Sequence, residues 1–235
     1  MRAIVTGASR GIGLAIARAV LTQGGRVMVT GLDKKRLDRA VQMLAADAVG
    51  RVEGAAVDVR DRTSVEKLVT DTEKKFGGLD LLVNNAGVGA FENVATMSDA
   101  DWARVIETNL TGVFYCSRAA IPVLKRSGGG WIINIASLAG RNYFPGGAAY
   151  CASKAGLIAF SEALMQEVRY DNIRVSVVMP GSVATEFSGP SAPDEEDAWK
   201  LSPDDVAEAV MDLVRHPGRS LPSKVEIRPS KPRKG

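Results

Sequence analysis

The chain has 235 residues, a length that suits one α/β domain with a substantial core, and its formal net charge of +3 is nearly balanced. No basic stripe interleaved with aromatic residues occurs, and no apolar stretch reaches the roughly 18 residues of a membrane span, so nucleic-acid and membrane partners are not expected. The chain opens on an apolar run rather than a signal peptide, and its two cysteines have neither metal nor redox spacing. We expect a soluble, cytoplasmic protein with free thiols and no metal site, although the sequence alone permits one disulfide.

Short runs rich in β-branched residues alternate with amphipathic segments along the whole chain. The runs are apolar throughout rather than at every second position, which is typical of strands covered on both faces. We predict strands at residues 3–6, 26–30, 52–57, 79–83, 131–135 and 174–178, with a last short strand at 225–228.

Helical patterns fill the segments between these strands. The first helix carries an apolar stripe with Ile12, Ile16 and Val20 and ends at Gly24-Gly25, and Asp33 is a suitable N-cap for the second. Further helices are predicted at about 33–46, 61–76, within 101–126, 150–169 and 203–215. This alternation predicts one α/β domain over residues 1–235, built as a doubly wound parallel sheet of the Rossmann type.

Two segments differ from this alternation. Residues 188–197 are rich in turn formers and acids, and their place after the sixth strand predicts a mobile substrate loop over 188–200. A surface loop without a role is the alternative. Residues 229–235 form a short basic tail, which we interpret as a solvated chain end.

A glycine-rich turn joins the first strand to the first helix. Gly7 permits a tight turn, Gly11 lets the backbone approach a pyrophosphate, and Gly13 allows close packing of helix and strand. The helix N-terminus adds free N–H groups and a positive dipole end. We predict that this turn binds a dinucleotide through Gly7, Ser9, Arg10, Gly11, Ile12 and Gly13.

Further motifs follow in order along the chain. They are Asp58-Val59 after the third strand, Asn84-Asn85-Ala86-Gly87 after the fourth, Asn109 in the long helix, Ser137 after the fifth strand, Tyr150 and Lys154 on the next helix, and Pro180-Gly181 with Thr185 after the sixth strand. Together with the Gly-x3-Gly-x-Gly turn, they resemble the short-chain dehydrogenase/reductase family over nearly the whole chain. The resemblance implies an NAD(P)-dependent oxidoreductase that interconverts a carbonyl and a secondary alcohol.

The resemblance also implies where the cofactor lies. Asp58 would accept a hydrogen bond from the adenine amino group while Val59 packs near the ring, and Asn84 would be structural, tying adjacent strands together. Bare backbone would approach the cofactor at a second glycine-containing turn, where a larger Cβ would clash. The remaining predicted cofactor contacts are Leu32, Asn85, Ala86, Gly87, Tyr150, Lys154, Pro180, Gly181, Val183 and Thr185.

NADP(H) is favoured over NAD(H) as the cofactor. Family members that prefer NAD usually carry an acid where Gly31 stands, and that acid is missing here. Many that prefer NADP carry Arg where Leu32 stands, which is missing too. Arg10, with Lys34 and Lys35 near, is a basic residue suited to a 2′-phosphate. Asp33 offers the alternative, an acceptor for the 2′-hydroxyl of NAD.

The predicted catalytic residues are Asn109, Ser137, Tyr150 and Lys154. Lys154 lies four residues after Tyr150 on one helix face, so its charge, together with that of an oxidised nicotinamide, is expected to lower the tyrosine pKa and make it a general acid/base. Ser137 would bind the substrate oxygen, and Asn109 would support the lysine. A non-catalytic cofactor sensor on the same fold is the main alternative. An epimerase or dehydratase is disfavoured because its different glycine spacing and longer substrate domain are missing.

The substrate is a small carbonyl or alcohol compound that the sequence does not name. We expect residues 87–91, residues 138–149 and the loop after Gly181 to form its walls, with Tyr143, Phe144 and Phe187 as apolar groups. Arg141 is either a carboxylate clamp or a solvated rim residue. Helices 101–126 and 150–169 are the usual pairing surface of the family, which implies a homodimer or homotetramer.

Overall fold

The strands of the protein pair in parallel to form a doubly wound sheet. The computed structural model describes residues 1–188 and 198–232, and within them seven strands have the order β3-β2-β1-β4-β5-β6-β7. The strands are β1 (Arg2–Val5), β2 (Arg26–Gly31), β3 (Val52–Ala56), β4 (Leu81–Asn84), β5 (Gly130–Ile135), β6 (Ile173–Pro180) and β7 (Lys224–Ile227). The predicted fold is confirmed. Most of the predicted loop 188–200 and the last three residues of the tail lie outside the described residues.

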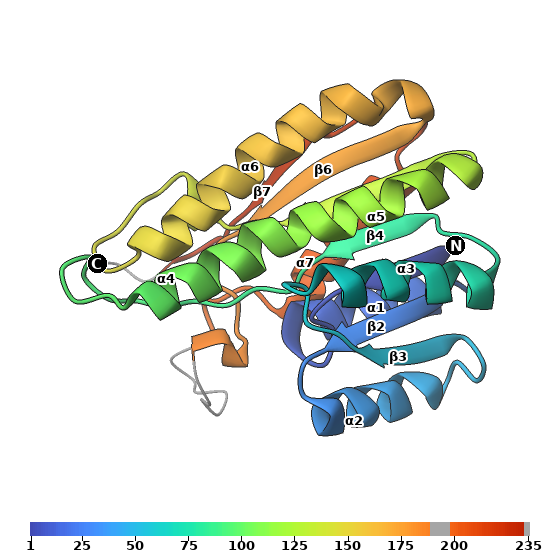
Figure 1. Cartoon of the computed structure of the whole chain (residues 1–235), viewed down its shortest axis with the longest axis horizontal. Helices are drawn as coiled ribbons and strands as arrows, with labels where there is room; N and C mark the ends of the chain where they lie inside the picture. Colours follow the sequence, from blue (N-terminus) through green and yellow to red (C-terminus); the bar gives the residue numbers. More distant parts are fainter. Residues whose placement is uncertain (189–197, 233–235) are drawn as a thin grey trace.

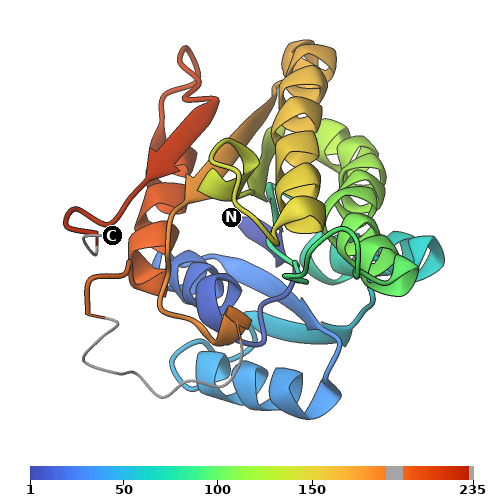
Figure 2. The ribbon, with the colours of Figure 1, turned by 90° about the vertical axis from the view of Figure 1, so that its left-hand side faces the viewer.

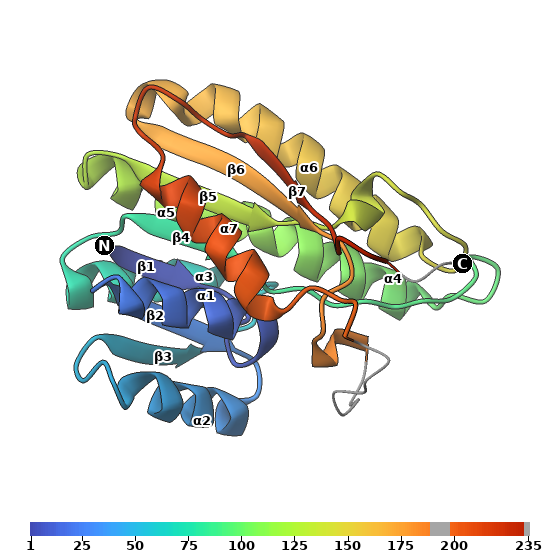
Figure 3. The same ribbon diagram turned by 180° about the vertical axis from the view of Figure 1, so that it is seen from behind.

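Helices cover both faces of the sheet. They are α1 (Gly11–Thr22), α2 (Lys34–Ala45), α3 (Arg62–Phe76), α4 (Asp99–Ile106), α5 (Gly112–Arg126), α6 (Ala148–Val168) and α7 (Pro203–Arg215). Figure 1 shows α3, α5 and α6 on the near face, and Figure 3 shows α1 and α7 on the opposite one. Each face has its own apolar cluster, with Ile16 and Val210 in one and Leu68 and Leu164 in the other. No helix in the described part of the chain is long and apolar enough to cross a membrane.

Local signals explain where the helices start and stop. The Asp33 carboxylate accepts from the Arg36 N–H at 3.1 Å and begins α2, as predicted. Asp61 begins α3 in the same way, and Gly77 ends it in the left-handed conformation at φ +78°. These caps define where α2 and α3 begin and where α3 ends.

The predicted long helix within 101–126 is divided in two. A π-helical turn (Glu107–Thr111) lies between α4 and α5. Such a turn adds a residue to the helix and reorients the side chains within it. Asn109 lies in this turn and is fully buried.

The expectation of coverage on both faces is wrong for β3. Residues of β3 and β7 alternate between more and less exposed positions. Both strands lie at an edge, where the covering helices leave part of the surface open. In the centre, the Asn84 side chain donates to the Asn134 Oδ1 at 2.8 Å and ties β4 to β5, the structural role predicted for it.

Candidate active site

A cleft of about 920 Å³ opens at the carboxyl ends of the strands. Figure 2 views the molecule from this end. The strand order reverses between β1 and β4, which is where doubly wound sheets bind ligands. Nearly all of the predicted cofactor residues line the cleft: Gly7, Ser9, Arg10, Gly11, Ile12, Leu32, Asp58, Val59, Asn85, Ala86, Gly87, Tyr150, Lys154, Pro180, Gly181, Val183 and Thr185.

The glycine turn leaves the start of α1 open to an anion. No side chain caps this helix and no acid lies in its first turn, whereas α2, α3 and α7 are capped by Asp33, Asp61 and Ser202. Gly7 has φ +62°, and a Cβ there would lie 2.7 Å from the Ala86 Cα. The bare backbone and the uncapped N–H groups fit the pyrophosphate of a dinucleotide.

Gly13 lies where close packing leaves no room for a side chain, as predicted. It is not among the residues that line the cleft. A Cβ at this position would lie 2.5 Å from the Asn85 Nδ2 and 2.6 Å from the Gly7 oxygen. Gly13 therefore allows the first helix to approach the two turns that carry the site.

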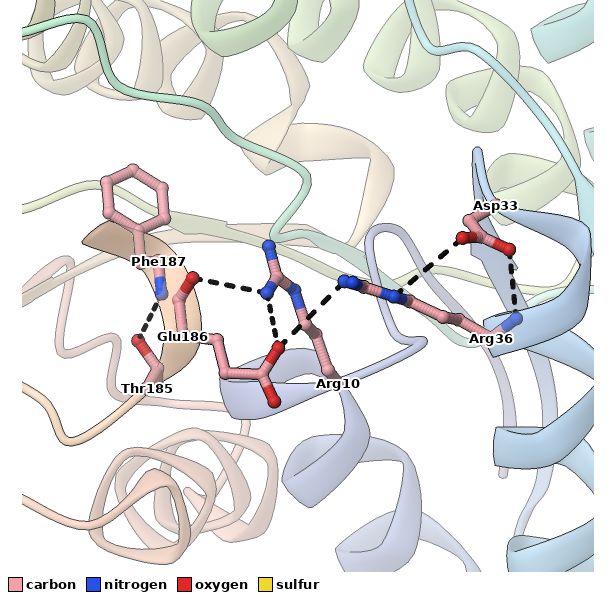
Figure 4. Close-up of polar contacts among 6 residues, drawn as sticks. All are labelled: Arg10, Asp33, Arg36, Thr185, Glu186 and Phe187. Atoms are coloured by element: carbon pink, nitrogen blue, oxygen red, sulfur yellow. Dashed lines mark hydrogen bonds and ion pairs between the residues drawn. The ribbon is translucent and has the colours of Figure 1, made fainter. Parts of the chain in front are cut away.

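A chain of charged side chains crosses one end of the cleft (Figure 4). Arg10 contacts the Glu186 carboxylate at 2.7 Å, and Arg36 lies 3.9 Å from the same oxygen and 3.7 Å from Asp33. All four residues line the cleft. This end therefore presents two guanidinium groups held by carboxylates.

The sequence did not identify Arg36 and pointed instead to Lys34 and Lys35. Neither lysine lines the cleft, and Lys34 pairs with Asp38 at 2.8 Å on the outside of α2. Because successive helix residues point about 100° apart, only part of the first turn faces the cleft. Leu37 is buried in the core, and Arg36 lies about 100° from it around the helix, so the apolar pattern of α2 gave no signal for Arg36.

The carboxylate of Asp58 lines the cleft but is already bonded. Arg60 donates to it from its side chain at 2.6 and 3.0 Å and from its backbone N–H at 2.9 Å. These bonds, the side-chain bonds above all, lower the pKa of Asp58 and keep it an ionised acceptor. Such an acceptor suits an adenine amino group.

Ser137, Tyr150 and Lys154 meet on the cleft wall near the end of β5. Ser137 follows this strand, and its hydroxyl accepts from the Ala139 N–H at 3.1 Å. Tyr150 and Lys154 lie one turn apart on α6, with the Lys154 Nζ 5.8 Å from the centre of the tyrosine ring. The Lys154 ammonium donates to the Ile135 carbonyl at 2.9 Å and is buried.

Burial is the largest influence on the pKa values of Tyr150 and Lys154. It raises the pKa of the Tyr150 phenol, and the neighbouring Ser137 hydroxyl opposes this by a smaller amount. Burial also lowers the pKa of Lys154 to about 8. Burial therefore sets the direction of the Tyr150 pKa shift in the protein by itself, and the expected lowering, which also involves the charge of an oxidised nicotinamide, stays a prediction for the complex with the cofactor.

Asn109 does not line the cleft but supports the residues that do. Its amide donates to the Val88 carbonyl at 2.9 Å and to the Ser153 hydroxyl at 3.0 Å, and its oxygen accepts from the Val88 N–H at 2.8 Å. A Cβ on Gly87 would lie 3.3 Å from the Asn109 Oδ1 and 3.6 Å from the Lys154 Nζ. Asn109 therefore joins the turn after β4 to the helix that carries Tyr150 and Lys154.

Aromatic side chains line the cleft beside Tyr150. Phe91, Phe144 and Phe187 belong to this wall, in agreement with the predicted substrate segments. Tyr143 is a correction, because it lies outside the cleft and is 70% exposed. Arg141 also lies outside the cleft, where it pairs with Glu226, so the solvated rim position is the one observed.

The family model for short chain dehydrogenases matches residues 1–196. The chain belongs to the short-chain dehydrogenase family. An uncharacterised oxidoreductase of Staphylococcus saprophyticus is 36% identical over 97% of this chain and 96% of its own length. The protein is accordingly an NAD(P)-dependent oxidoreductase.

Solved structures of this family agree with the fold over its whole length. An alcohol dehydrogenase from the archaeon Thermococcus sibiricus, complexed with 5-hydroxy-NADP, has a TM-score of 0.91 at 31% identity and covers 99% of this chain and 98% of its own. A serine dehydrogenase complexed with NADP⁺ has a TM-score of 0.87 at 33% identity and covers 97% and 94%. Both similarities extend well beyond the glycine turn.

Proposed function

We propose that the protein interconverts a carbonyl compound and its secondary alcohol, with NADP(H) as hydride carrier and Tyr150 as the proton donor and acceptor. The observation that carries the proposal is the meeting of Ser137, Tyr150 and Lys154 on the wall of the cleft that begins at the glycine turn. When bound, the nicotinamide supplies or accepts the hydride.

The side chains have separate tasks in the reducing direction. Ser137 donates a hydrogen bond to the carbonyl oxygen and holds it beside Tyr150. The raised pKa of Tyr150 keeps its phenol protonated at neutral pH, ready to transfer that proton to the oxygen as the C=O π bond is lost. The Lys154 ammonium then stabilises the phenolate, which regains its proton from solvent. Asn109 positions the lysine.

Two observations support NADP(H) over NAD(H). Arg10 and Arg36 bring guanidinium groups to the end of the cleft beside β2, and guanidinium binds phosphate well. Asp33, the alternative acceptor for NAD, is used to cap α2. The two solved structures named above are complexes with 5-hydroxy-NADP and NADP⁺, which also favours NADP(H).

We further propose a homodimer or homotetramer that pairs through α4–α5 and α6. These helices lie side by side on one face of the molecule (Figure 1), and α5 exposes 40% of Phe114 there. An exposed aromatic ring on a helix face is typical of an interface.

The mutation Tyr150→Phe tests the chemical role. The variant should fold and bind NADPH, measured by circular dichroism and cofactor fluorescence, while kcat falls by about 10²-fold or more. Tyr143→Phe, on the neighbouring loop outside the cleft, is the matched control and should keep full activity. Retained turnover in Tyr150→Phe would refute the mechanism. Cofactor binding by the wild type with no oxidation across a broad carbonyl panel would favour the sensor alternative.

A further inference from the structure

We propose that the substrate is an uncharged ketone, or the corresponding alcohol, that carries an aromatic ring on the carbon next to the carbonyl. This inference rests on the proposed function and specifies the substrate class of the same site. It is carried by the phenylalanine side chains around Tyr150.

Three rings from separate segments gather at the catalytic tyrosine. Phe91, between β4 and α4, meets the Tyr150 ring edge-on with centroids 5.6 Å apart. Phe187, after β6, lies 5.7 Å from it on a different segment. Phe144, between β5 and α6, lies 6.0 Å from Phe91 and extends the wall. Aromatic pairs favour these separations, so a further ring has partners there in edge or offset geometry.

Two glycines make room for these three rings. A Cβ at Gly89 would lie 2.8 Å from the Phe91 ring and 3.2 Å from the Phe187 ring. A Cβ at Gly147 would lie 2.5 Å from the Phe144 ring. A side chain at either glycine would displace the rings, so glycine at these two positions keeps the aromatic wall in place.

The rings present apolar surface that a ligand can cover. Phe91, Phe144 and Phe187 are 50%, 43% and 40% exposed, although all three line a cleft. Apolar surface gathered in a cleft beside a few polar groups is typical of a ligand site. Here the polar groups are Ser137 and Tyr150, which suit one carbonyl oxygen.

Paired charges around the cleft argue against an anionic substrate. Arg104 and Arg228 line it, but each has a carboxylate partner, Asp101 at 2.7 Å and Glu226 at 2.9 Å. Lys200 also lines the cleft, and a keto acid drawn to it is the alternative that the test must exclude.

The test compares three ketones by NADPH oxidation: 1-phenyl-2-propanone, 2-butanone and acetoacetate. We expect kcat/KM for the phenyl ketone to exceed both others by about 10²-fold, since burial of a ring adds several methylene equivalents of binding. In Phe91→Leu and Phe144→Leu, the ratio of kcat/KM for the phenyl ketone to kcat/KM for 2-butanone should fall about tenfold. In Tyr143→Leu, a control on the same loop outside the cleft, the ratio should stay at the wild-type value.

The outcomes separate this inference from the proposed function. Preference for acetoacetate or 2-butanone, or an unchanged ratio in both phenylalanine variants, would overturn the aromatic substrate and leave the reductase intact. NADPH binding by fluorescence with no reduction of any carbonyl would overturn the proposed function, and this inference with it.

Discussion

The two ends of the cleft differ in the chemical groups that line them. At the cofactor end, the part that suits phosphate groups consists of bare backbone at Gly7 and Gly11 and of the Arg10 and Arg36 guanidinium groups, all within the first 36 residues. The substrate end consists of aromatic side chains that meet from three distant segments. A site of consecutive backbone positions is a local property of the chain, whereas a site of converging side chains depends on the whole fold.

One short segment belongs to both ends. Thr185 accepts from the Phe187 N–H at 3.4 Å, and the residue between them, Glu186, holds Arg10 (Figure 4). Three consecutive residues thus connect Arg10, which we propose binds phosphate, to the ring beside Tyr150. The following predictions test how far the two ends are separate.

The largest effect is expected at the glycine turn. Gly7→Ala adds a Cβ 2.7 Å from the Ala86 backbone at φ +62°, whereas Gly24→Ala has similar φ, +77°, and no atom within 4 Å. We expect Gly7→Ala to lower the free energy of unfolding by about 3 kcal/mol and to weaken NADPH binding, and Gly24→Ala to cost only about 1 kcal/mol. Urea unfolding of both variants measures this. Equal losses of unfolding free energy in the two variants would mean that the close approach of Gly7 to Ala86 does not contribute to stability.

Both the reduction rate and the stability of the protein should depend on pH through Lys154. Its pKa of about 8 means that the ammonium dominates below pH 8 and is lost above it, so kcat/KM for reduction should fall about tenfold per pH unit beyond that point. The free energy of unfolding should change in the opposite sense. Since the folded pKa is below the ordinary 10.5, the unfolded chain binds more protons between these values, and this group's contribution to stability rises with pH.

A pH–rate profile from 6 to 9.5, with urea unfolding at pH 7 and pH 9, checks both signs. A rate that stays level to pH 9.5 would show that the Lys154 pKa is not lowered in the working enzyme.

The smallest effect is expected at the segment shared by the two ends. Glu186 is half exposed and competes with a 2′-phosphate for Arg10 and Arg36, so Glu186→Gln should tighten NADP⁺ binding about two- to fivefold and leave NAD⁺ binding unchanged. Glu66→Gln, which removes a surface pair with Arg62, is the control. Titration calorimetry with both cofactors gives the comparison. Weaker NADP⁺ binding in Glu186→Gln would mean that the carboxylate orients the arginines instead of competing.

Much of the fold was predictable because its signals are local. Strand and helix alternation, the caps at Asp33 and Asp61 and the stop at Gly77 each depend on a few consecutive residues. The edge character of β3 was missed because strand order, and hence coverage, is not a local property.

The sequence by itself determined the parallel sheet, the dinucleotide turn and the spacing that puts Tyr150 and Lys154 on one helix face. Only the tertiary structure decided that Arg36 rather than Lys34 faces the cleft, that Asn109 bonds to Val88 and Ser153, and that burial governs the pKa values of Tyr150 and Lys154. The physical reason is the range of the interactions. Backbone conformation and helix periodicity act over a few residues, while burial and ring contacts arise only where distant segments meet.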